Sequence, residues 1–169
     1  MAKNQTLKIT EMDRYLFGQG THYEIYKLMG AHPTKQKGKD GVYFAVWAPR
    51  AQEVAVVGDF NGWDPNENIM KCDNDMGIYQ LFIPGVKSGD LYKFCITSPS
   101  GELLYKADPY ANYAEKRPGN ASRVYDITNF KWNDSVWMKN RQNYDVNKNA
   151  MSIYEVHPGS WRKHPQNEH

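Results

Sequence analysis

The segment Gly41-Val42-Tyr43-Phe44-Ala45-Val46-Trp47-Ala48-Pro49 has a side-chain period of two, in which Val42, Phe44 and Val46 alternate with the residues between them. β-Branched and aromatic side chains at this spacing are typical of a β-strand that directs successive side chains to opposite faces. We therefore expect a strand that ends at the Ala-Pro pair. Similarly β-rich segments follow at residues 54–57, 78–83, 91–96 and 123–127.

Turn-forming pairs separate these segments, among them Asn61-Gly62, Pro84-Gly85 and Ser98-Pro99. Glycine, proline and asparagine supply the backbone conformations that tight turns require. Several short strands at this spacing predict a β-sandwich, which takes about 100 residues. The predicted fold class is therefore mainly β, with the sandwich over residues 41–128.

The first forty residues carry helix signals instead. Thr10 and Thr21 are each followed three residues later by a carboxylate, the capping-box pattern that satisfies free amides at a helix start. Gly30 is in the usual position to end the second helix. Residues 34–40 have no apolar side chain, which predicts a solvated loop. We expect a short helical segment over residues 1–40.

The last forty residues are expected to hold a connector and one late strand. Residues 129–150 are mostly polar and have no sustained period. Residues 152–157 alternate again and predict one more strand, which would expose an unpaired edge in a finished sandwich. We therefore expect residues 151–169 to be the truncated start of a second domain, joined by a connector over 129–150.

The composition disfavours several classes of protein. Lysine plus arginine number 21 against 19 for aspartate plus glutamate, so the net charge of +2 is too small for a general binder of nucleic-acid phosphates. The longest apolar run, residues 42–48, is far shorter than the roughly 20 residues that a bilayer helix needs. Because the N-terminus has no apolar stretch of a signal peptide, we expect a cytoplasmic protein with no membrane or nucleic-acid partner.

The sequence predicts no metal site and no cofactor. The five histidines show no paired metal-ligand spacing, and the acidic residues around Asp73 do not complete a calcium loop. No phosphate-binding or dinucleotide-binding glycine pattern is present. Cys72 and Cys95 match neither a disulfide framework nor a zinc site, so we expect both to be reduced.

The turn at Asn61-Gly62 is the leading candidate for a binding site. It should project Trp63 from the sheet edge, where the indole could lie on the apolar face of a pyranose while polar groups bind the hydroxyls. Lys93, expected to point outward from its strand, is a candidate donor, and Asn61 is a third candidate. The alternative is that Trp63 folds back over the core and that Lys93 is only a solvated side chain.

The predicted late strand holds three further candidates, Tyr154, Glu155 and His157, which would line a substrate rather than catalyse. Glycoside chemistry requires two carboxyl groups about 5 to 9.5 Å apart, and nothing in the sequence identifies a partner for Glu155. We therefore predict no catalytic residue in this chain.

Four motifs resemble the N-terminal part of bacterial 1,4-alpha-glucan (glycogen) branching enzymes: residues 20–33, 44–49, 57–64 and 107–110. Residues 152–157 resemble the first strand of that family's catalytic barrel. The resemblance implies a carbohydrate-binding module of family 48, an immunoglobulin-like β-sandwich that precedes an α-amylase-type (β/α)8 barrel. It also implies transfer of α-1,4-glucan segments to form α-1,6 branches, by carboxylates on barrel strands that lie beyond this chain.

For individual residues, the resemblance implies that Trp63 stacks on glucose and that Lys93 hydrogen-bonds the sugar. The chain departs from the pattern of strong binders at two places. Glu102 and Leu103 stand where a second stacking tryptophan is expected, and residues 118–122 lack the apolar-plus-amide pair. The expected partners are an α-1,4-glucan and the catalytic barrel.

Three alternatives to the N-terminal part of a branching enzyme stay open. The chain could be a stand-alone α-glucan-binding module, although the strand predicted at 152–157 would have no purpose there. The sandwich could pack against a barrel without binding sugar, which Leu103 favours for this surface. The chain could also be the N-terminal part of a debranching enzyme of the isoamylase type, although the predicted helix at 22–33 argues against this.

Overall fold

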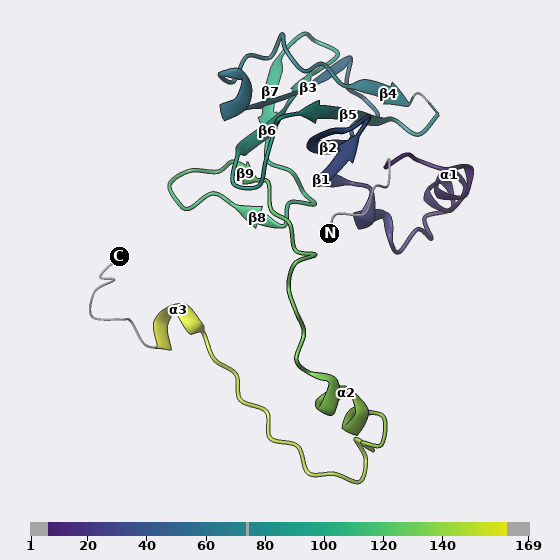
Figure 1. Cartoon of the computed structure of the whole chain (residues 1–169), viewed down its shortest axis with the longest axis vertical. Helices are drawn as coiled ribbons and strands as arrows, with labels where there is room; N and C mark the ends of the chain where they lie inside the picture. The colour runs from purple at the N-terminus through teal and green to yellow at the C-terminus, as the bar shows by residue number, and fades with distance from the viewer. Residues whose placement is uncertain (1–6, 74, 162–169) are drawn as a thin grey trace. The chain divides into compact units, whose positions relative to one another are not determined.

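A computed structural model of the protein describes residues 7–73 and 75–161. The chain forms two compact units, Met1–Asn129 and Phe130–His169 (Figure 1). Within the described residues, no helix is long and apolar enough to cross a membrane.

The described part of the first unit folds into two antiparallel sheets. The first, the β2 sheet, has the strand order β1-β2-β5-β4: β1 (Gly30–Gln36), β2 (Lys39–Trp47), β5 (Ile78–Pro84) and β4 (Lys71–Asp73). The second, the β6 sheet, has the order β3-β6-β9-β8, with β7 also paired to β6: β3 (Glu53–Gly58), β6 (Leu91–Thr97), β9 (Ser122–Arg123), β8 (Tyr113–Ala114) and β7 (Leu103–Lys106).

The main core lies between the two sheets. Because side chains alternate along a strand, every second residue of β2 points inward, and Phe44 is completely buried against Tyr92 of β6, with ring centroids 5.1 Å apart. Other buried members of this core come from both sheets: Val42, Val46, Val54, Val56, Tyr79, Phe94 and Val124. The sequence-based prediction of a mainly β sandwich is confirmed.

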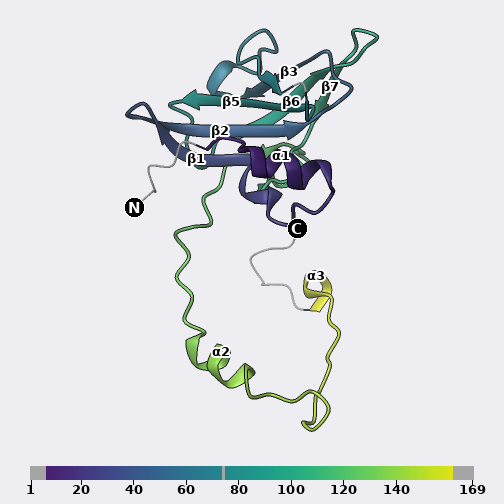
Figure 2. The same ribbon diagram turned by 90° about the vertical axis from the view of Figure 1, so that its right-hand side faces the viewer.

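Residues 7–29, which we call the N-terminal segment, cover the outer face of the β2 sheet (Figures 1 and 2). The helix α1 (Glu11–Gly18) begins at Thr10, whose side chain and that of Asp13 form the predicted capping box. A second core lies beneath this segment and is built from Ile9, Met29, Tyr43, Ala45 and Ile78. The β2 sheet is therefore packed on both of its faces.

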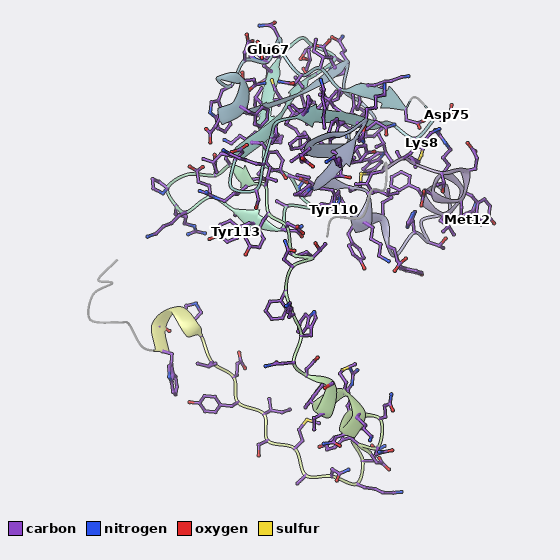
Figure 3. The ribbon with its side chains drawn as sticks, in the orientation of Figure 1. Lys8, Met12, Glu67, Asp75, Tyr110 and Tyr113 are labelled. Carbon is purple, nitrogen blue, oxygen red and sulfur yellow. The ribbon has the colours of Figure 1, made fainter. Side chains whose placement is uncertain are left out.

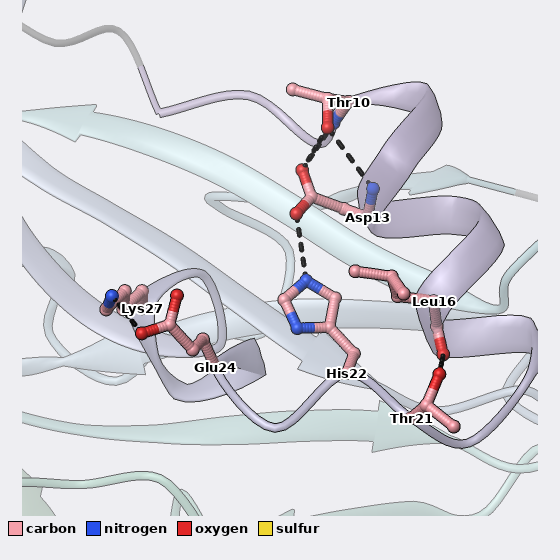
Figure 4. A network of polar contacts seen from close by, with 7 residues as sticks. All are labelled: Thr10, Asp13, Leu16, Thr21, His22, Glu24 and Lys27. Atoms are coloured by element: carbon pink, nitrogen blue, oxygen red, sulfur yellow. Dashed lines mark hydrogen bonds and ion pairs between the residues drawn. The ribbon is translucent and has the colours of Figure 1, made fainter.

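Two expectations for the first forty residues are wrong. The second helix is only a 3-10 turn, η1 (Ile25–Lys27), which has no side-chain cap at its N-terminus. The Thr21 hydroxyl donates to the Leu16 carbonyl at 3.5 Å instead (Figure 4). The expected loop at 34–40 is the β1–β2 hairpin, whose two turn residues, Lys37 and Gly38, both have positive φ, at 48° and 79°. A polar edge strand lacks the apolar alternation that reveals a strand in sequence, and the hairpin crosses the boundary predicted at residue 40.

The second unit contains the helices α2 (Ser135–Arg141) and α3 (Pro158–Trp161). The strand predicted at 152–157 is wrong, because those residues form no ladder within the described part of the chain and their side chains are exposed. A strand requires a hydrogen-bonded neighbour, and an alternating pattern alone does not supply one. The strand predicted at 123–127 is likewise shorter than expected, since β9 contains only Ser122 and Arg123.

Candidate functional site

The outer face of the β6 sheet gathers the side chains of three strands. In the antiparallel register, Val57 and Ala55 of β3 lie opposite Lys93 and Cys95 of β6, and Tyr105 of β7 also lies opposite Cys95. Directly opposed residues share a face of the sheet, so these side chains form one surface. We call it the Trp63 face, after the indole that packs on it.

Trp63 lies on this face because the preceding turn directs it back onto the sheet. After the 3-10 turn η2 (Asp59–Asn61), Gly62 and Trp63 both adopt left-handed backbone conformations, with φ of 60° and 64°. The half-buried indole then packs on Ala55, Val57 and Cys95, and its Nε1 donates to Asp59 Oδ1 at 3.2 Å. The ring therefore covers an apolar patch outside the main core and keeps part of its surface open.

Asn61 shapes this turn through both ends of its side-chain amide. Its Nδ2 donates to the Val56 carbonyl at 3.0 Å, and its Oδ1 accepts from the Gly58 amide at 2.9 Å. The Trp63 amide adds a bond to the Gly58 carbonyl at 3.0 Å. Asn61 thus positions Trp63 and has its amide engaged with the backbone.

Lys93 has a side-chain partner that the sequence did not indicate. Its Nζ donates to Asn120 Oδ1 at 2.5 Å. Asn120 lies in a loop whose ends are joined by two bonds between Glu115 and Ala121: Glu115 N to the Ala121 carbonyl at 2.9 Å, and Ala121 N to Glu115 Oε2 at 3.0 Å. The segment 118–122 therefore does bring an amide to this face.

Tyr105 is a second aromatic ring on the face, and sequence reasoning missed it. Its side chain is 46% exposed, and burial together with Cys95 and Asp64 raises the pKa of its hydroxyl. The sequence did contain a signal for Tyr105. It follows Leu103 by two residues, so both side chains lie on the same side of the strand. Only the pairing of β7 with β6 shows that this side meets Cys95 beneath Trp63.

The motif at 107–110 has a structural role. Tyr92 donates its hydroxyl to Asp108 Oδ2 at 2.6 Å, the Tyr110 amide donates to Asp108 Oδ1 at 2.8 Å, and the Asp108 amide donates to Ser122 Oγ at 2.8 Å. Burial raises the pKa of Asp108 despite these bonds to its carboxylate. Gly30 of β1, with φ of 100°, lies close to this cluster, since a side-chain carbon there would be 3.1 Å from Tyr110 and 3.5 Å from Asp108 Oδ2.

The candidates predicted at the late strand lie in the second unit. The Tyr154 ring meets the Trp161 ring edge-on at 5.7 Å, and His157 Nδ1 lies 2.9 Å from Ser160 Oγ. Tyr154, Glu155 and His157 are all exposed. They share no element with the Trp63 face. Over residues 7–73 and 75–161, no cluster of three or more His, Cys, Asp or Glu is arranged to hold a metal ion.

Comparison with protein families identifies the sandwich. Residues 28–111 match the family described as carbohydrate-binding module 48 (isoamylase N-terminal domain). This range includes Trp63, Lys93 and Tyr105. The matched stretch contains most of the sandwich, from the end of the N-terminal segment to the loop after β7. The Trp63 face, apart from Asn120, therefore lies within the stretch that matches family 48.

The whole chain is similar to the N-terminal region of 1,4-alpha-glucan branching enzymes. It is 59% identical to the enzyme GlgB of Butyrivibrio fibrisolvens, over 96% of this chain and 25% of that protein. It is 51% identical to GlgB of Halothermothrix orenii, over 91% of this chain and 24% of that protein. The chain thus spans about a quarter of the length of the curated relatives that it matches, and the resemblance predicted from its motifs is confirmed.

Solved structures of PulA proteins also resemble part of this chain. PulA of Klebsiella pneumoniae is 28% identical with a TM-score of 0.47, over 58% of this chain and 9% of that chain. PulA of Klebsiella oxytoca is 26% identical with a TM-score of 0.45, over 61% of this chain and 10% of that chain. At these TM-scores the PulA proteins add nothing to the fold shown by the sheet order itself.

Proposed function

We propose that this chain supplies the glucan-binding module of a 1,4-alpha-glucan branching enzyme, and that an α-1,4-glucan binds on the Trp63 face. The observation that carries the proposal is the grouping of two rings, Trp63 and Tyr105, with the Lys93–Asn120 pair on one uncovered side of the β6 sheet. The family 48 match and the similarity to branching enzymes support the choice of ligand.

The chemistry of this face suits a glucose chain. A pyranose has an apolar C–H face that packs on an indole or phenol ring, and a rim of hydroxyls that seek hydrogen bonds. An ammonium has three donors, and Asn120 occupies only one donor of Lys93 in the structure. Trp63 and Tyr105 would therefore stack on the sugar, Lys93 would donate to its hydroxyls, and Asn61 would hold the Trp63 turn.

We place the branching step in the part of the relatives' length that this chain does not match. That step cuts an α-1,4 bond and passes the fragment to a 6-hydroxyl, which requires a pair of carboxylates facing the scissile bond. The chain by itself is expected to bind glucan without branching it. Branch formation by the purified chain, followed by the colour of the glucan–iodine complex, would contradict this. A cytoplasmic location stays a prediction.

Affinity electrophoresis in amylopectin gels tests the binding site. We expect the wild-type chain to be retarded, Trp63→Ala to lose most of the retardation, and Tyr105→Ala and Lys93→Ala to lose part of it. Trp132→Ala is the matched control, because Trp132 is a 77% exposed indole in the second unit. Circular dichroism checks that each variant is folded.

The competing function is packing alone, in which the face contacts a barrel and no sugar. Two observations favour packing. Trp63 covers Ala55, Val57 and Cys95, and Leu103 stands in place of a second ring. Equal mobility of the folded wild-type chain with and without amylopectin would overturn binding and leave packing as the function of this face.

A further inference from the structure

A second exposed indole lies on the opposite face of the sandwich. Along β2, the side chains of Tyr43, Ala45 and Trp47 form one row on the outer face of the β2 sheet. The N-terminal segment buries Tyr43 and Ala45, but it covers Trp47 only in part, and this indole is 55% exposed. The last ring of a covered row is therefore open to solvent.

Trp47 is held in a fixed orientation. Its Nε1 donates to the Met76 carbonyl at 3.0 Å, and the Phe17 ring of α1 meets it edge-on, with centroids 6.0 Å apart and planes at 75°. A ring already fixed by two neighbours loses little side-chain entropy when a ligand stacks on it.

Charged groups flank this indole in a groove lined by Arg14, Phe17, Trp47, Pro49, Asp75 and Met76. Arg14 Nη1 donates to Asp73 Oδ1 at 2.6 Å and lies 3.9 Å from Asp75 Oδ2. The Asp75 side chain is 93% exposed, at the turn between β4 and β5 (Figure 3). The groove thus has a flat ring, a guanidinium whose two terminal nitrogens bind Asp73, and an exposed carboxylate on one open surface.

The charges at the groove decide between ligand classes. The positive charge of Arg14 is opposed by Asp73, Asp75 and also Glu11 at 3.4 Å, so the groove is net negative and disfavours phosphates and other anions. A neutral ligand with an apolar face and a rim of hydroxyls fits the ring, and the exposed Asp75 carboxylate can accept from its hydroxyls.

We propose that the Trp47 groove is a second sugar site, which binds one or two glucosyl residues of an α-glucan chain. The choice of glucan as occupant rests on the proposed function of the module. Because Trp47 and Trp63 lie on opposite faces, one short oligosaccharide does not reach both, whereas separate chains of a branched polymer do. Two weak sites then give the module an avidity for glycogen or amylopectin that maltoheptaose does not experience.

Indole N–H resonances of the 15N-labelled 169-residue chain, titrated with maltoheptaose, test the second site. Single variants, Trp47→Ala and Trp63→Ala, assign the two resonances. In Trp63→Ala we expect the Trp47 resonance still to shift saturably, and Asp75→Ala to weaken that binding several-fold. Asp75→Ala tests the site without disturbing the fold, because its side chain is almost fully exposed. In amylopectin gels, the Trp63→Ala, Trp47→Ala double variant should migrate as it does without polysaccharide, and Trp132→Ala as wild type.

The outcomes separate this inference from the proposed function. A Trp63 resonance that shifts while the Trp47 resonance stays unmoved would overturn the second site and uphold the first. A Trp47 resonance that shifts while that of Trp63 does not would uphold the second site and overturn the first. No shift of either resonance, with no retardation of the wild-type chain in amylopectin, would overturn both.

Discussion

The two outer faces of the sandwich differ in what lies over them. On the β2 sheet, the N-terminal segment buries Tyr43 and Ala45 beneath Ile9 and Met29. On the β6 sheet, the ring of Trp63 takes the place of such a segment. The same alternation of side chains therefore produces a second core on one side and a candidate binding surface on the other. Whether an outer face becomes a core or a binding site depends on what packs over it, and the sequence of a single strand does not determine that.

Truncation of a side chain in the second core should give the largest difference in stability between the two faces. Met29 is 1% exposed in the second core, and Met29→Ala should lower the free energy of unfolding by about 2–5 kcal/mol through lost burial and a cavity. Leu103→Ala, on the uncovered β6 sheet at 46% exposure, should change it by no more than about 0.5 kcal/mol. Urea denaturation measures both, and equal losses would show that the two faces are not different in kind.

Alkaline pH should destabilise the covered face through Tyr43. Burial, with the charge of Asp73, raises the pKa of Tyr43 from 10.0 to about 12, and its hydroxyl donates to Gln80 Oε1 at 2.8 Å. A raised pKa means that the unfolded chain loses its proton first, so this stabilisation is complete below pH 10 and is lost as the pH rises to about 12. The loss should reach about 2–3 kcal/mol.

Tyr43→Phe isolates this contribution, because it keeps the ring and removes the titrating hydroxyl. The difference in unfolding free energy between wild type and Tyr43→Phe should change by that amount across the window, whereas Tyr23→Phe, at an 87% exposed position, should show no such change. A constant difference for Tyr43→Phe would mean that its hydroxyl is as accessible in the folded chain as in the unfolded one.

Sequence patterns predicted the elements that carry their own signal. The alternation at 42–47 and the capping box at Thr10 depend on neighbouring residues, and both are present in the structure. The strand β1 was missed because its residues are mostly polar and lack apolar alternation, and the strand predicted at 152–157 was wrong because pairing depends on a partner elsewhere. Local chemistry was therefore predictable, and long-range pairing was not.

In the candidate site, too, local signals were predictable from the sequence and long-range pairing was not. The Asn-Gly turn indicated Trp63, since the turn and the ring are adjacent in sequence. Tyr105 and Asn120 reach the same face only through the register of β7 on β6 and through the loop that ends at Ala121. The extent of the N-terminal cover, which leaves Trp47 open, also depends on tertiary packing.

Loss of the Thr10–Asp13 cap of α1, which anchors the N-terminal segment, should have a smaller effect on stability. The contribution of Asp13 should disappear in acid. Thr10→Ala removes the cap of α1 and should cost about 1 kcal/mol. Although burial alone would raise it, hydrogen bonds from Thr10 and His22 hold the pKa of Asp13 below its ordinary value of 3.8 (Figure 4). A lowered carboxyl pKa stabilises the fold above that value, and the contribution disappears as the pH falls below it.

The cost of Asp13→Ala should accordingly be largest at neutral pH and shrink under acid conditions, measured by urea denaturation at a series of pH values. Glu24→Ala is a suitable comparison, since the Glu24–Lys27 pair is largely exposed, at 63% and 56% for the two side chains. A cost for Asp13→Ala that persists unchanged in acid would mean that its charge does not hold the helix.

Addition of a ring to the open face should have the smallest effect. Leu103→Trp places an indole on the side of β7 that carries Tyr105, and a further stacking surface should strengthen amylopectin binding about three- to tenfold, equivalent to roughly 0.5–1.5 kcal/mol. Leu103→Ala should leave the affinity near that of wild type. Retardation in amylopectin gels measures both, and unchanged migration of Leu103→Trp would place the sugar away from β7.

The left-handed backbone at Trp63 has an evolutionary consequence. A bulky side chain at φ of 64° is strained by about 1–2 kcal/mol compared with glycine, which adopts this conformation freely. Exchange of Trp63 for glycine should therefore cost less stability than the lost packing on Ala55, Val57 and Cys95 alone, because relief of the backbone offsets part of that loss. A related chain that no longer binds glucan can thus replace this tryptophan at a reduced cost, which makes this turn the position at which loss of the sugar site should first be visible.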